Sequence, residues 1–338
     1  MVKLSVLDQS PVSAGSTPAE ALHNTIELAR LADRLGYARY WIAEHHAIDT
    51  LASPAPEILI ARVGAETTRI RVGSGAILLP HYSPMKVAET FRMLHALYPG
   101  RIDLGLGRAP GGTALEMYAL QRDRSRNQPI DDFPQQLLEL KAFLKSSFPR
   151  DHPFARITIT PAMPGMPELW LLGSSMWSAS AAAQLGMPYA FAHFIDQQPT
   201  RAAVEYYRAN FIASEDCAAP HAIVALGVMC AESEEEARRL NASARMLIRR
   251  IRLGGRGPVP TPEEALAELE STPDPLPNRP SEWPRYIVGD PGQVQLRLTA
   301  MAEQLQIDEL MVVTITHSHQ ARMRSYELLA DAFELPRP

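Results

Sequence analysis

The chain has 338 residues, of which 46% are hydrophobic and 21% charged, the balance of a globular protein with a large core. Its formal net charge of −5 argues against nucleic acid or an anionic membrane surface as a partner. Because only Cys217 and Cys230 are present, and neither a secretion signal nor a membrane-spanning apolar run occurs, we expect a soluble, cytoplasmic protein without disulfides or a cysteine-based zinc site.

Strand-like and helix-like segments alternate along most of the chain. The first strand is expected at Leu4–Leu7, and the helix after it begins at the capping box Thr17-Pro18-Ala19-Glu20 and ends at Gly36. Further strands are expected at 40–42, 70–79, 101–106, 169–172, 189–192, 223–230 and 309–313. Helices are expected at 56–67, 84–97, 137–144, 175–185, 201–212, 233–250, from 291 onward and at 320–333.

Eight strands, each followed by at least one helix, predict a single α/β domain over residues 1–338, a (β/α)8 TIM barrel. The strands are apolar throughout, as in a parallel sheet that is buried on both faces, and no linker divides the chain into two doubly wound domains. Three stretches interrupt the alternation, at about 109–132, 148–167 and 251–289. We expect irregular insertions there, at the C-terminal face of the strands, where barrels carry active sites.

Glu44, His45 and His46 directly follow the second strand. Since neighbouring residues point in opposite directions, one imidazole should line the pocket while the other is buried or hydrogen-bonded. Two purely structural histidines are the plain alternative. No H-E-x-x-H motif and no second cluster with ligand spacing accompany this pair, so no metal site is predicted.

Two glycine-containing segments fall within the third strand and at the end of the fourth. Glycines within Gly73-Ser74-Gly75-Ala76 indicate either close approach of a ligand to the backbone or room for packing at a barrel corner. The run Gly100 to Gly112 is similar at first sight to a dinucleotide fingerprint, but Pro110 replaces its third glycine and no helix follows at once. The remaining feature is Arg108 at a strand end, which suits a phosphate or carboxylate, or else a surface ion pair.

The segment Gly173-Ser174-Ser175-Met176-Trp177-Ser178 runs from a strand directly into a helix. The start of a helix offers free N–H groups and the positive end of its dipole, and the hydroxyls of Ser174, Ser175 and Ser178 can add donors. These residues could form a phosphate cradle without a lysine, although simple capping by serine would use them too. Arg108 at another strand end favours the phosphate interpretation.

In this order, these segments resemble the luciferase-like flavin-dependent oxidoreductases of the bacterial luciferase superfamily, and within it the stand-alone, non-bioluminescent subgroup. The resemblance runs from the first strand through Pro188 and again over about 286–330. It implies FMN at the C-terminal ends of the barrel strands, a cis Gly75–Ala76 peptide beneath the flavin ring, and His45 as the active-site histidine. The implied cofactor-binding residues are Gly75, Ala76, Arg108, Gly173, Ser174, Ser175, Trp177 and Ser178.

Two departures from the light-emitting members argue against bioluminescence: Gly107 stands in place of their reactive cysteine, and 251–289 does not resemble their mobile lid. The leading hypothesis is a two-component monooxygenase. It would use reduced FMN from a separate NAD(P)H:flavin reductase, together with O₂, to oxygenate a small organic substrate. His45 would hold or transfer a proton.

Three alternatives stay open. The same barrel could serve a deazaflavin-dependent dehydrogenase or an NAD(P)H-dependent flavin oxidoreductase, or it could bind flavin without turnover. A metal-dependent hydrolase built on His45 and His46 ranks last. The helices at 56–67 and 84–97 also carry more apolar residues than one barrel wall needs, which predicts a homodimer; these residues are Ile58, Leu59, Val63, Val87, Phe91 and Leu94.

Overall fold

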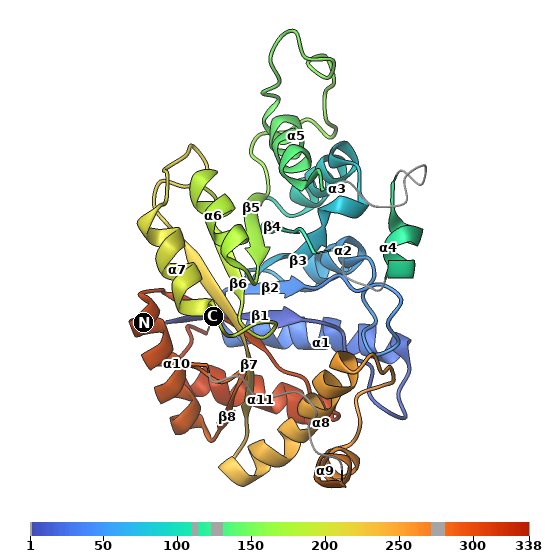
Figure 1. The fold of residues 1–338 in the computed structure, drawn as a ribbon, viewed down its shortest axis with the longest axis vertical. Coiled ribbons are helices and arrows are strands. Elements are labelled where there is room, and N and C mark those ends of the chain that lie inside the picture. The colour runs from blue at the N-terminus through green and yellow to red at the C-terminus, as the bar shows by residue number, and fades with distance from the viewer. Residues whose placement is uncertain (1, 110–113, 123–130, 272–280, 338) are drawn as a thin grey trace.

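Parallel strands form a closed barrel at the centre of the molecule, shown in a computed structural model that describes residues 2–109, 114–122, 131–271 and 281–337 (Figure 1). The barrel strands are β1 (Lys3–Asp8), β2 (Arg39–Ile42), β3 (Arg71–Leu78), β4 (Ile102–Gly107), β5 (Glu168–Gly173), β6 (Tyr189–Ala192), β7 (Ala222–Cys230) and β9 (Glu309–Val313). Each strand pairs with the next in this order, and β9 pairs with β1 to close the ring. The predicted (β/α)8 fold is confirmed.

Helices surround the barrel and connect its strands (Figure 1). Those before β5 are α1 (Pro18–Leu35), α2 (Pro56–Glu66), the 3-10 turn η1 (Leu79–His81), α3 (Pro84–Leu97), α4 (Ala114–Leu120) and α5 (Phe133–Lys145). Those after it are α6 (Met176–Gln184), α7 (Thr200–Ala209), α8 (Glu234–Arg252), α9 (Pro262–Ser271), α10 (Pro291–Leu305) and α11 (His319–Ala332).

Local sequence signals set several helix ends where they were expected. Thr17 accepts a hydrogen bond from the Glu20 N–H, the Glu20 side chain reaches back to the Thr17 N–H, and Gly36 ends α1 in the left-handed conformation. Asp290 caps α10 in the same way. The prediction of a helix at 137–144 was too short because α5 begins at Phe133, with a proline in its first turn.

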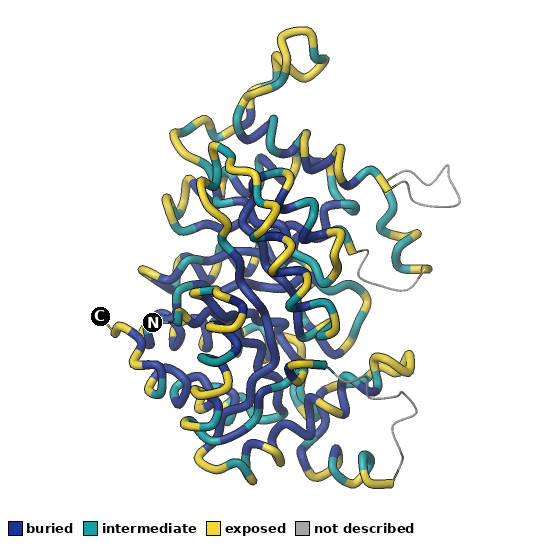
Figure 2. The backbone as a smooth tube through the Cα atoms, turned by 60° about the vertical axis from the view of Figure 1, so that its left-hand side comes forward, coloured by how far each residue is buried: buried dark blue, intermediate teal, exposed yellow. Residues whose placement is uncertain are grey.

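The barrel strands are buried on both faces, as their apolar sequences predict. All six residues of β4 and all nine of β7 are buried. Figure 2 shows this burial as a continuous dark core, with the exposed residues in the surrounding helices and loops. Outward-facing strand residues pack against the helices, and inward-facing ones such as Trp41 and Trp170 fill the barrel interior.

Two of the three stretches expected as irregular insertions contain helices or strands, and the third is irregular as predicted but lies at the other end of the barrel. Helix α4 lies within 109–132, and 251–289 contains α9 together with the strand β8 (Tyr286–Gly289), which pairs with the second half of β7. The stretch 148–167 joins α5 to the start of β5, so it lies at the N-terminal end of the barrel rather than at the C-terminal face. Regular structure in 251–289 begins at a proline, since Pro262 starts α9.

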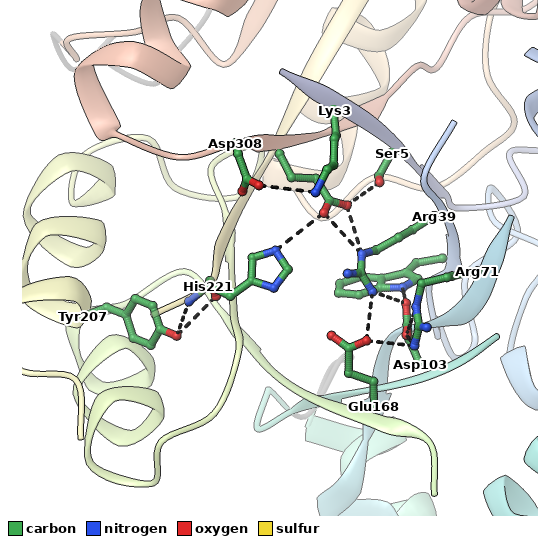
Figure 3. A network of polar contacts seen from close by, with 11 residues as sticks. Lys3, Ser5, Arg39, Arg71, Asp103, Glu168, Tyr207, His221 and Asp308 are labelled. Carbon is green, nitrogen blue, oxygen red and sulfur yellow. Dashed lines mark hydrogen bonds and ion pairs between the residues drawn. The ribbon is translucent and has the colours of Figure 1, made fainter. Parts of the chain in front are cut away.

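A network of charged side chains fills the N-terminal end of the barrel interior (Figure 3). The Asp103 carboxylate accepts hydrogen bonds from Arg39 Nη1, Arg71 Nε and Trp41 Nε1, each at 2.8 Å. Arg39 also lies over the Trp170 ring, 4.6 Å from its centroid. We call this group the closed-end network; its members are Ser5, Arg39, Trp41, Arg71, Asp103, Glu168, Trp170, His221 and Glu309.

Glu309 is the second buried acid of the closed-end network. It accepts hydrogen bonds from the Ser5 hydroxyl at 2.5 Å and from Arg39 Nε at 3.0 Å, and His221 Nε2 lies 3.7 Å away. Burial alone would raise the pKa of Glu309, but these contacts hold it below its usual value. The network is thus charged and internally paired, and it closes this end of the barrel.

The apolar residues that suggested a homodimer are mostly part of the barrel core. Five of the six named above are buried, and only Ile58 is exposed, at 69%. They were misassigned because helices that cover a barrel need a wide apolar face of their own. Within the described ranges, no helix is long and apolar enough to cross a membrane.

Candidate active site

The C-terminal ends of the barrel strands surround a cavity of about 530 Å³. Every site residue proposed from the sequence lines this one cavity: His45, Gly75, Ala76, Arg108, Gly173, Ser174, Ser175, Trp177 and Ser178. They come from four neighbouring positions in the barrel, namely the ends of β2, β3 and β4 and the turn from β5 into α6. Residues spread over 134 positions (178 − 45 + 1) are therefore brought together by strand order alone.

Glu44 links the loop after β2 to the end of β3 and to the residue after η1. Its buried carboxylate accepts hydrogen bonds from the Leu78 N–H at 3.0 Å and the Tyr82 hydroxyl at 2.9 Å. His46 Nε2 lies 2.6 Å from the same carboxylate, and its ring meets that of His81 edge to face. The two adjacent histidines therefore diverge, as strand alternation predicts. Among the described residues, no group of three or more histidines, cysteines or acids could hold a metal ion.

His45 is the histidine that lines the cavity. Its backbone N–H donates to the Ser53 carbonyl, but its buried Nδ1 has no hydrogen-bond partner in the described part of the chain. Burial, helped by the neighbouring His46, lowers the pKa of His45 to about 4. The imidazole is consequently neutral at neutral pH. The neutral ring carries one N–H proton, so its Nδ1 can donate or accept a hydrogen bond according to the tautomer.

The peptide between Gly75 and Ala76 is cis, as the resemblance implied. It lies where the register of β3 with β4 shifts, between Ser74 and Ile77. A Cβ atom on Gly75 would lie only 2.7 Å from a Leu7 methyl carbon, so no larger residue fits without displacing the barrel interior. Gly75 and Ala76 thus form a wall of the cavity from which few side-chain atoms project.

Arg108 and Trp177 meet at the rim of the cavity. The guanidinium lies over the indole, 4.4 Å from the ring centroid. It also forms a two-pronged ion pair with Asp131, in which Nε lies 3.2 Å from Oδ1. Both partners are exposed, Arg108 at 40% and Asp131 at 57% of the side chain. Arg108 therefore forms the surface ion pair that was considered as an alternative, and it also lines the cavity.

The start of α6 faces the same rim. Ser175 is the N-cap residue, yet its side chain makes no capping hydrogen bond within the described structure, so the first N–H groups of α6 are left without that partner. Simple capping by Ser175 is thus ruled out. The Ser178 hydroxyl was a predicted donor, but it already donates to the Ser175 carbonyl at 2.7 Å. A Cβ on Gly173 would lie 2.4 Å from that hydroxyl oxygen, which explains the glycine.

Several lining residues escaped sequence analysis. Gln9 follows β1, and Phe194 and Ile195 follow β6, where they complete the cavity together with Met311 of β9. Their position immediately after or within a barrel strand was a usable signal, but their side chains carry no motif. The stretch 110–113, with Pro110, lies outside the described residues.

Comparisons with known proteins agree with this geometry. The family model for luciferase-like monooxygenases matches residues 2–309. A luciferase-like monooxygenase of Escherichia coli is 38% identical over 98% of this chain and 97% of its own length. The N-acetyl-S-alkylcysteine monooxygenase of Bacillus subtilis is 36% identical over 98% of both chains.

Solved structures share the fold. The crystal structure of apo-MsnO8 is 51% identical and superposes with a TM-score of 0.93 over the whole of both chains. The oxygenating constituent of 3,6-diketocamphane monooxygenase from Pseudomonas putida, solved in complex with FMN, has a TM-score of 0.72 at 20% identity, covering 100% of this chain and 99% of that one. An F420-dependent secondary alcohol dehydrogenase has a TM-score of 0.64 at 14% identity and covers 98% of both chains.

Proposed function

Because the chain belongs to the luciferase-like monooxygenase family, we propose that it is a flavin-dependent monooxygenase that uses reduced FMN and O₂ to oxygenate a small organic molecule. The observation that carries the proposal is one cavity with an arginine and an uncapped helix start on its rim and an unpartnered histidine nitrogen within. Relatives named as monooxygenases support the reaction class.

The residues present fit FMN. Arg108 and the N–H groups at the start of α6, with the Ser174 and Ser175 hydroxyls, would hold the phosphate, since anions bind well at uncapped helix starts. The wall at Gly75 and Ala76 would accept the ring. Reduced FMN bound there would supply the electrons that activate O₂. We propose that a separate NAD(P)H:flavin reductase supplies it.

The chain's own contribution is to bind, orient and exclude water. Leu7, Trp41 and Leu78 make the inner end of the cavity apolar. A dry cavity limits side reactions and strengthens every hydrogen bond made within it. His45, neutral at neutral pH, can donate or accept one hydrogen bond at Nδ1 according to its tautomer. We propose that this nitrogen hydrogen-bonds the reacting group.

Rapid mixing tests this proposal. Purified protein with reduced FMN is mixed with O₂, and the return of the oxidised flavin spectrum is followed. We expect reoxidation to be slower on the wild-type protein than on His45→Ala by about 100-fold, the lower end for loss of one positioned proton-handling group. His46→Ala is the matched control, because its ring faces Glu44 and His81.

Equal rates for wild type and His45→Ala, or an equal effect at His46, would give the histidine a purely structural role. Reduced F420 and NAD(P)H serve as alternative reductants in parallel samples. Turnover with reduced F420 but not with reduced FMN would replace the proposal by a deazaflavin-dependent dehydrogenase.

We also propose a homodimer, now on the exposed side chains of Ile58 in α2 and of Met93 and Leu97 in α3, which are 69%, 58% and 61% exposed. A stable interface needs more than about 1,000 Å² of buried surface. Light scattering at micromolar concentration that gave only the 37.3 kDa monomer would contradict it.

A further inference from the structure

The cavity has two chemically different halves. One half, from the ends of β2 to β5 and the start of α6, carries His45, Arg108 and the serines. The other half is formed by β6, β7, β9 and β1, which are consecutive in the barrel. We call it the apolar half; its main side chains are Leu7, Gln9, Ala190, Phe194, Ile195 and Met311.

Charge is confined to the first half. The ionisable side chains that line the cavity within the described ranges are Glu44, His45 and Arg108, and none belongs to the apolar half. The Glu44 carboxylate is occupied by Leu78, Tyr82 and His46. A charged group placed in the apolar half would therefore lose its water without gaining a partner, which is strongly unfavourable.

Gln9 is the polar exception in the apolar half. Asp8, one residue earlier, points outward and pairs with Arg322, so alternation turns Leu7 and Gln9 inward. Gln9 is 9% exposed and lines the cavity, and its carboxamide makes no hydrogen bond to any residue that the structure describes; its nitrogen and oxygen are not among the buried unpartnered atoms, so they are open to the cavity. A ligand in the cavity can therefore reach this amide without displacing a hydrogen bond to any of the described residues. It offers two N–H donors and one carbonyl acceptor to whatever occupies the cavity.

We infer that the apolar half binds the organic substrate, and that this substrate is an uncharged, largely apolar small molecule whose carbonyl or hydroxyl group hydrogen-bonds Gln9. The inference rests on the proposed function, which assigns the other half to the flavin. Phe194 and Ile195 lie in the loop after β6, and Ile195 is 56% exposed, so the apolar surface continues to the mouth. An aromatic or alicyclic skeleton matches these side chains.

Three probes of one skeleton test the inference by calorimetric titration of FMN-saturated protein: 2-acetylnaphthalene, 2-isopropylnaphthalene and 2-naphthoate. We expect the ketone to bind about 3- to 10-fold more tightly than the hydrocarbon, the gain from one hydrogen bond to a buried amide. We expect the carboxylate to bind at least about 10-fold more weakly than the ketone.

Two variants separate the hydrogen bond from apolar burial. Gln9→Leu should abolish the preference for the ketone while leaving hydrocarbon binding in place. Ile195→Ser should weaken both neutral probes equally. The inference is wrong if Gln9→Leu keeps the full preference for the ketone, or if 2-naphthoate binds FMN-saturated protein as tightly as the ketone.

Direct titration with FMN is the independent arm. If FMN binds and the probes do not follow the expected order, the substrate class is wrong and the proposed function stands. If FMN fails to bind, the probe series is repeated on Arg108→Ala, which removes the cation of the cavity lining. The expected order in that variant would support the uncharged ligand and overturn the flavin assignment. Any other order would overturn both.

Discussion

Two arginine–aspartate ion pairs lie one at each end of the barrel. In both, the guanidinium also lies over a tryptophan ring, but the two pairs differ in burial. Arg39 pairs with Asp103 and lies over the Trp170 ring at the N-terminal end. Arg108 pairs with Asp131 and lies over the Trp177 ring at the C-terminal end. The first pair is 9% and 0% exposed, the second 40% and 57%. Burial is the difference between them.

Burial decides whether another anion can replace the aspartate of such a pair. The Asp103 carboxylate accepts hydrogen bonds from three side chains, so removing its charge would leave Arg39 and Arg71 with only Glu309 and Glu168 as acidic partners. The exposed pair contributes only about 0–1 kcal/mol, because water and salt compete with it. An incoming anion can therefore take Asp131's place at Arg108 at little cost. The buried pair holds the N-terminal end of the barrel together, whereas Arg108 at the C-terminal end can exchange its partner.

The largest expected effect is at the buried pair. Asp103→Asn removes the most buried of the charges that compensate Arg39 and Arg71, and breaking a buried ion pair costs about 3–5 kcal/mol of unfolding free energy. Urea unfolding followed by circular dichroism measures it. Asp131→Asn is the matched control and should change the unfolding free energy by less than about 0.5 kcal/mol. Similar losses in both variants would remove the distinction between the two ends.

The second effect concerns His45 at the C-terminal end of the barrel, whose buried Nδ1 has no hydrogen-bond partner among the described residues. Its pKa is about 4 in the folded protein and near 6.5 when unfolded, so between these values the unfolded chain binds the extra proton. Wild-type stability therefore falls as pH drops from 6.5 to 4. His45→Gln lacks this loss and should gain up to about 3 kcal/mol relative to wild type at pH 4. Urea unfolding at several pH values tests this, and a pH-independent difference would contradict it.

The sequence predicted the strand order, most helices and the candidate site residues, because those depend on periodicity, caps and strand ends. It did not show that the Ser178 hydroxyl already donates to the Ser175 carbonyl, or that Arg108 forms an ion pair with Asp131. Nor did it show that the Gln9 carboxamide makes no hydrogen bond to the described residues. Each of these contacts depends on how side chains from different strands and loops are oriented in the folded barrel. The closed-end network was missed for the same reason: Arg39, Asp103 and Glu309 are far apart in sequence and share no motif.

The third effect is on flavin affinity. Arg108→Ala removes a charge-assisted contact to the phosphate and should weaken FMN binding by about 1.5–3 kcal/mol, roughly 10- to 150-fold. Quenching of FMN fluorescence measures the affinity. Arg122→Ala is the matched control, since Arg122 forms a similar exposed pair with Asp132 but does not line the cavity. Unchanged affinity in Arg108→Ala would place the phosphate elsewhere.

The smallest expected effect, again on flavin affinity, is specific to the ion pair at the C-terminal end of the barrel. Asp131 competes with the phosphate for Arg108 and repels it, so Asp131→Asn should tighten FMN binding by up to about 5-fold, the value of an exposed ion pair. Riboflavin has the same ring but no phosphate, and its affinity should stay unchanged. The gain should shrink at high salt, which screens exposed charges. If Asp131→Asn weakened FMN binding, or altered riboflavin binding equally, Asp131 would hold the rim in place rather than compete for Arg108, and the two pairs would then be alike in function and different only in depth.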